Sequence, residues 1–185
     1  MGRLPQGYLG ISHETRGGDI LAVLKVLHSP EVTLGPELYS RFVGVNPEDW
    51  YPIENFLEML EKLDGKLGSY GLRQVGWKIF STFHAAKARE LFTTARGLLN
   101  GLDHMYHQAN RGTKIGGWKL SQFEPGLAVV EKSTPHHCGM ELGILEEAMR
   151  TINVRADVSH LACFRTGAPL CRFQVTTRAV DERWG

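Results

Sequence analysis

The chain has 185 residues, and its 21 lysines and arginines balance 20 aspartates and glutamates to a formal net charge of +1. A chain of this size can bury one full hydrophobic core, and the absence of a basic run argues against a nucleic-acid partner. No stretch of about 18 apolar residues could span a bilayer, and Met1–Gly7 lacks an apolar signal core. We therefore expect a cytoplasmic protein with no membrane partner.

Helices are predicted throughout the first half of the chain, because apolar residues recur there at helical spacing. Asp19 is placed to cap the first helix, and Asp64-Gly65 is placed to end the second. Gly97 and Gly101 lie inside the last and longest one, where they would allow another helix or a ligand to approach closely, or a second copy of the chain if the protein is an interaction subunit. The four predicted helices cover residues 18–29, 53–63, 69–81 and 86–109.

The pattern changes to a period of two after residue 112, which indicates strands. Residues 118–131 predict a β-hairpin around Pro125-Gly126, residues 138–151 a helix, and residues 153–163 and 170–178 two further strands. This order predicts an α+β fold in which N-terminal helices pack on an antiparallel sheet of two β-hairpins with an intervening helix. We divide the chain into an N-terminal helical segment, 1–68, and an α+β region, 69–185, joined in one continuous domain.

A histidine and all three cysteines lie in the last third of the chain, as Cys138, His160, Cys163 and Cys171. Thiolates and neutral imidazoles are the ligands that zinc prefers. Because His160 precedes Cys163 by three residues, a strand would point them to opposite faces unless a bulge intervenes near Leu161-Ala162. His137 is an alternative ligand to Cys138, and packed thiols or a Cys163–Cys171 disulfide are the alternatives to a metal.

Four protein ligands would close the zinc shell, so the metal is predicted to be structural. The catalytic alternative uses three ligands and a water, with Glu141 or Glu146 as the base. His104 and His107 share one helix face and could bind a metal or a haem iron, although such histidines are also ordinary surface residues. No triad or phosphate-binding motif is present, so we expect no enzyme.

The second half of the chain contains five short motifs: Gly116-Gly-Trp118, Pro125–Glu131, Ser133–Cys138, Gly143–Glu146 and Cys163-x3-Gly167-x3-Cys171-x-Phe173. On these motifs, residues 70–178 resemble the 4-vinyl reductase domain, a small-molecule-binding module of bacterial and archaeal regulators. The resemblance implies a zinc ion at the C-terminal hairpin, with His160 where sensory members have a carboxylate and Cys138 near their upstream cysteine. It also implies a ligand cavity between helices and sheet.

The aromatic residues in the middle of the chain are the candidates for lining such a cavity. We expect Trp77, Phe80, Tyr106 and Trp118 to do so. The resulting hypothesis is a non-catalytic sensory module that binds a hydrophobic or aromatic small molecule, carries a structural zinc and signals through a partner or a homodimer. The alternatives are a protein-interaction subunit, since 4-vinyl reductase domains resemble vesicle-tethering subunits, and a protein that binds haem or another tetrapyrrole. A reductase acting on a tetrapyrrole vinyl group lacks a nicotinamide or flavin motif here.

Overall fold

The computed structural model describes residues 4–5 and 12–185 of the chain. Most of the Met1–Gly7 segment, on which the expected absence of a signal core rests, lies outside the described residues. Within the described part, no helix is long and apolar enough to cross a bilayer.

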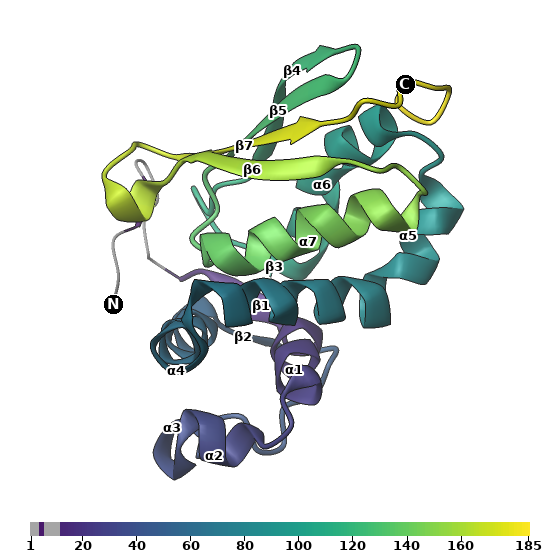
Figure 1. Cartoon of the computed structure of the whole chain (residues 1–185). Coiled ribbons are helices and arrows are strands. Elements are labelled where there is room, and N and C mark those ends of the chain that lie inside the picture. The colour runs from purple at the N-terminus through teal and green to yellow at the C-terminus, as the bar shows by residue number, and fades with distance from the viewer. Residues whose placement is uncertain (1–3, 6–11) are drawn as a thin grey trace.

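A four-stranded antiparallel sheet covers one side of the molecule, with the strand order β4-β5-β7-β6. Figure 1 shows α7 directly beneath this sheet and α4 beneath α7. The two predicted hairpins therefore join into one sheet, because β5 pairs with β7. The bounds are β4 Trp118–Glu124, β5 Leu127–Lys132, β6 Asp157–Ala162, β7 Cys171–Thr176 and α7 Cys138–Thr151.

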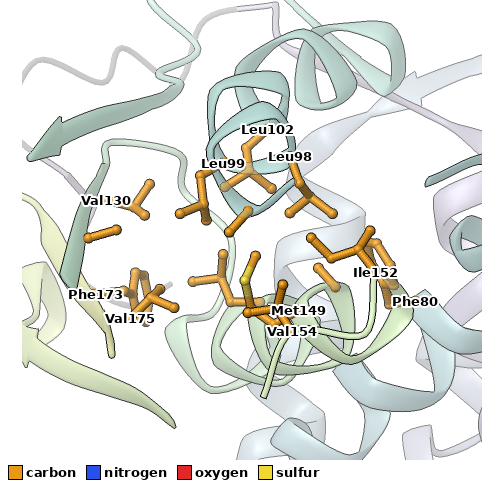
Figure 2. Packing of buried hydrophobic residues seen from close by; sticks show 14 of the residues in the cluster. Phe80, Leu98, Leu99, Leu102, Val130, Met149, Ile152, Val154, Phe173 and Val175 are labelled. Atoms are coloured by element: carbon orange, nitrogen blue, oxygen red, sulfur yellow. The ribbon is translucent and has the colours of Figure 1, made fainter. Parts of the chain in front are cut away.

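The predicted α+β class is confirmed, with one change in how its layers pack. The helices that contact the four-stranded sheet are α6 (Ala95–Ala109) and α7, whereas α1 and α2 pack mainly on α4. Figure 2 shows Leu98, Leu99 and Leu102 of α6 facing Val130, Phe173 and Val175 of the sheet, with Met149 of α7 between them. This buried cluster holds the sheet side of the molecule together through apolar burial.

The helices of the first half are α1 (Gly17–Val26), α2 (Pro30–Leu34), α3 (Pro36–Ser40) and α4 (Ile53–Ile79). Two predicted helices, 53–63 and 69–81, are joined in α4 across a kink at Gly68, which has φ 66° and ψ 172°. A glycine takes this left-handed backbone without a steric penalty. The kink lies at the predicted boundary between segment 1–68 and region 69–185. The division of the chain into these two parts stays a prediction.

The predicted long helix over 86–109 is wrong, because the chain breaks there into α5 (Ala85–Leu91) and α6. A π-helical turn, Phe80–His84, precedes α5. Phe92 is extended, and the Thr94 side chain caps α6 by accepting a hydrogen bond from the Gly97 N–H at 3.1 Å. A Cβ at Gly101 would lie 2.4 Å from the Phe92 ring, so this glycine makes room for a side chain of its own chain.

A small second sheet, with order β2-β1-β3, was not predicted. Its strands are β1 (Glu14–Arg16), β2 (Trp50–Pro52) and β3 (Asn110–Arg111), and it ties the start of α1 to the end of α6. Each strand is too short to give a period-two signal. Asp19 is the third residue of α1 and not its cap, because the N-cap position is Arg16.

Candidate metal centre and ligand cavity

Three sulfurs and one imidazole meet at the end of the sheet. The ligand atoms of Cys138, His160, Cys163 and Cys171 all lie within 4.8 Å of one another. The Sγ–Sγ distances are 2.8 Å for Cys138–Cys171, 3.4 Å for Cys163–Cys138 and 3.9 Å for Cys171–Cys163. A tetrahedron with Zn–S bonds of about 2.3 Å has S–S edges of roughly 3.8 Å. The two distances to Cys163 are close to this value, and the Cys138–Cys171 distance is shorter.

Local backbone features bring these four side chains together. The β6–β7 register shifts between His160 and Ala162, which is the bulge that the sequence requires at this point. Gly167, with φ 119°, then turns the chain back so that Cys171 opens β7. Cys138, the first residue of α7, contributes the remaining sulfur.

His137 is engaged elsewhere and does not join the cluster. Its Nδ1 accepts a hydrogen bond from the Gly139 N–H at 3.1 Å and so caps α7, while its Nε2 lies 3.4 Å from Asp64. The structure therefore groups Cys138, and not His137, with the other three residues. All three cysteines are free, so Cys163 and Cys171 form no disulfide.

A buried lysine sets the electrostatics of the cluster. The Lys132 ammonium is fully buried, donates to the His136 carbonyl and lies 3.9 Å from Cys138 Sγ. The hydrogen bond shared with Cys171 and burial raise the pKa of Cys138 to about 12, and the same bond lowers the pKa of Cys171. Three thiolates around Zn²⁺ leave one net negative charge, which the Lys132 ammonium is placed to balance.

A cavity of about 120 Å³ lies near the cluster, since its lining includes His136, two residues before Cys138. Three of the four predicted aromatic residues, Phe80, Tyr106 and Trp118, line it. The fourth, Trp77, does not: its Nε1 donates to Glu146 at 2.7 Å, and Arg73 and Arg150 flank its ring. The remaining lining residues are Asp19, Val23, Phe56, Ile79, His84, Leu102, Met105, Ala109, Asn110, His136, Met140, Glu141 and Ile144.

Sequence reasoning missed the polar residues of this cavity. Asp19 comes from α1, His136 from the loop before α7, and Glu141 from α7, so no spacing along the chain connects them. His104 and His107, which the sequence offered as metal or haem ligands, are exposed and contact Gln108 and Asp103. Glu141 lies 3.4 Å from His136 Nδ1, and Glu146, the other candidate base, pairs with Arg73.

Three groups in the cavity wall have shifted pKa values. Burial raises the pKa of Asp19 to about 6, although the nearby His136 opposes the shift. It also lowers the pKa of His84, so that this imidazole is neutral at pH 7. Burial acts to raise the pKa of Glu141, but contacts with His136 and Lys132 outweigh it, and the pKa lies below its ordinary value.

We expect Asp19→Asn to stabilise the ligand-free protein at high pH only. Because the folded-state pKa of Asp19 lies above its unfolded value, ionisation costs folding free energy as pH rises from about 4 through 6. A shift of this size corresponds to at most about 3 kcal/mol, and the lost interaction of an acid with the α1 N-terminus offsets part of the gain. Urea unfolding should show a gain of about 1–2 kcal/mol at pH 8 and none at pH 4. An equal change in the free energy of unfolding at both pH values would show that burial does not raise the pKa of Asp19.

No family model matches the sequence, and no curated protein is similar to it. The fold, however, is similar to that of H-NOX domains. An H-NOX protein from S. oneidensis in the Fe(II) ligation state matches with a TM-score of 0.65 and 12% identity, over 92% of this chain and 100% of that chain. An NMR structure of an H-NOX domain from Shewanella oneidensis in the Fe(II)CO ligation state gives 0.63 and 14%, over 89% and 99%. A Cs H-NOX mutant gives 0.62 and 15%, over 86% and 94%.

The predicted resemblance to the 4-vinyl reductase family is wrong, because the similar structures are H-NOX domains, and these match 86–92% of the chain. The most specific of the motifs that suggested the 4-vinyl reductase domain is a hairpin with two cysteines and a turn glycine, Cys163, Gly167 and Cys171. Such a hairpin can occur in more than one fold, so it does not determine the family.

Proposed function

We propose that this chain is a non-catalytic sensory domain whose ligand occupies the cavity between α1, α4, α6 and α7. The observation that carries the proposal is the cavity itself, which is mostly apolar and has a few convergent polar groups. The similar structures support it, since they include an H-NOX protein in the Fe(II)NO ligation state. A bound molecule would signal by favouring one arrangement of these helices, which a partner protein or a second copy then recognises.

Haem, or another tetrapyrrole, is the second candidate ligand, and the fold favours it because one similar structure was determined in a study of haem redox potential. The cavity wall offers two imidazoles, His84 and His136, that could hold an iron. The charge and the volume of the cavity fit a haem less well. The wall has two carboxylates, Asp19 and Glu141, and no lysine or arginine among its described residues, whereas a haem brings two propionates. A haem also needs far more space than the cavity of about 120 Å³ provides.

We also propose that Cys138, His160, Cys163 and Cys171 bind a structural zinc ion. The four ligands would leave no open position for water, so the metal would join the start of α7 to the β6–β7 hairpin. Its support is the mutual proximity of the four ligand atoms and the buried ammonium beside them.

A cavity-filling variant tests the ligand site. Ala109 lines the cavity at the end of α6, whereas the preceding Gln108 is exposed on the same helix. We expect toluene or hemin to raise the melting temperature of the wild type by mass action, and Ala109→Phe to abolish the rise because the ring occupies the site. Gln108→Phe, which inserts the same ring on the outer face, should retain it.

Two results would decide between the candidates. A hemin absorption band that changes with His84→Ala or His136→Ala would favour the tetrapyrrole. If neither probe binds the wild type, or if Ala109→Phe binds as well as the wild type, the cavity is not a ligand site.

A further inference from the structure

The unpartnered polar atoms in the cavity wall are hydrogen-bond acceptors. Asn110 is 2% exposed, and its amide nitrogen donates to the Tyr106 carbonyl at 3.1 Å, while its Oδ1 has no partner among the described residues. His136 is 5% exposed, and its Nε2 likewise has no partner in the described part of the chain. Buried acceptors without partners are rare in folded proteins, because each one costs the free energy of its lost contact with water.

The contacts of His136 indicate that its free nitrogen is an acceptor. Its Nδ1 lies 3.4 Å from Glu141 Oε1, and the carboxylate also lies 3.5 Å from Thr134 Oγ1. A carboxylate beside Nδ1 holds the ring proton on that nitrogen and leaves the lone pair on Nε2. Phe56 and Tyr106 contact the ring edge-on, so the described neighbours of His136 supply no donor to that lone pair.

Asp19 adds a third acceptor to the same wall. It forms no hydrogen bond or ion pair with any described residue, although it interacts electrostatically with His136 and Glu141. Lys132 interacts electrostatically with Glu141, but its ammonium donates to the His136 carbonyl and it does not line the cavity. The carboxylates of Asp19 and Glu141 therefore face a cavity whose described wall contains no lysine or arginine.

The size of the cavity limits the ligand further. A dry cavity of about 150 Å³ is large enough for benzene, and this one holds about 120 Å³ between apolar side chains such as Leu102, Met105 and Ile144. One aromatic ring, or an apolar group of similar volume, matches this space.

We propose that the cavity binds a single-ring aromatic or similarly sized apolar molecule that carries a hydroxyl or amino donor, which Asp19, Asn110 and His136 accept. This inference rests on the proposed function and adds the chemical class of the ligand. The donor would satisfy acceptors that the protein leaves unpaired, whereas an anionic group would meet two carboxylates.

Four ring compounds of similar size test the proposal: p-cresol, benzylamine, toluene and benzoate. We expect calorimetry to show p-cresol and benzylamine binding about tenfold more tightly than toluene, since a hydrogen bond to a buried acceptor gives a difference of that order. Benzoate should bind more weakly than toluene. Asp19→Asn should weaken benzylamine binding by about tenfold and leave toluene binding unchanged. Asp49→Asn, at an exposed acid away from the cavity, should change neither.

The outcomes separate the two proposals. If toluene binds as tightly as p-cresol and benzylamine, or if benzoate binds most tightly, the donor class is wrong while the ligand site stands. If none of the four compounds binds and Ala109→Phe changes nothing, both proposals fail.

Discussion

Replacing Cys171 with alanine is expected to remove the bound zinc and to lower the free energy of unfolding by about 4 kcal/mol or more, a loss typical of removing a metal. Cys171 is fully buried at the start of β7, and its Sγ lies 2.8 Å from that of Cys138 at the start of α7. The free energy of binding a structural zinc is part of the free energy of folding, because the unfolded chain does not hold the site together. Elemental analysis and urea unfolding on the same samples would measure both effects.

Val175→Ala is the matched control for lost packing. Val175 is fully buried on the same strand, so its truncation should cost about 1–3 kcal/mol without changing the zinc content. Chelator treatment should bring the wild type down to the stability of Cys171→Ala and leave that variant unchanged. Wild-type protein purified without chelator but free of zinc would contradict the metal proposal.

Gly143→Ala is expected to destabilise the protein by about 3 kcal/mol or more, since the new methyl group has no space and overpacking already costs roughly 1–3 kcal/mol in cores that can adjust. A Cβ at Gly143 of α7 would lie 2.0 Å from the Arg73 carbonyl oxygen of α4, and one at Gly76 of α4 would lie 2.1 Å from the Met140 carbonyl oxygen of α7. The two backbones are therefore in direct contact, and a methyl group at either position must push the helices apart. Urea unfolding would measure the loss.

Gly65→Ala, in α4, is expected to stabilise the protein, in contrast to Gly143→Ala. Apart from its chain neighbours and the nearby backbone of α4, no described atom lies within 4 Å of a Cβ at Gly65. Alanine should therefore stabilise the helix by about 0.5–1 kcal/mol through its higher helix propensity. If Gly143→Ala is as stable as the wild type, the close approach of α4 and α7 does not hold the fold together.

The sequence predicted the parts of the fold that depend on local periodicity. The hairpin at 118–131 and the helix at 138–151 appear as β4, β5 and α7, because alternating and helical apolar spacing persists over many residues in each. The long helix at 86–109 failed because its apolar spacing continues past Phe92 and Thr94, where capping and a tertiary contact break the helix. The second sheet was missed because its pairing is long-range and its strands span three residues or fewer.

The same contrast applies to the two candidate sites. By itself, the sequence determined which residues could bind a metal, because cysteine and histidine are few and their side chains define the chemistry. Only the tertiary structure decided that Cys138 and not His137 joins the cluster, that Trp77 lies outside the cavity, and that Asp19, Asn110 and His136 line it together. These residues are far apart in the chain, and the packing of α1, α6 and α7 that brings them to one wall follows from burial of apolar surface, which no local spacing records.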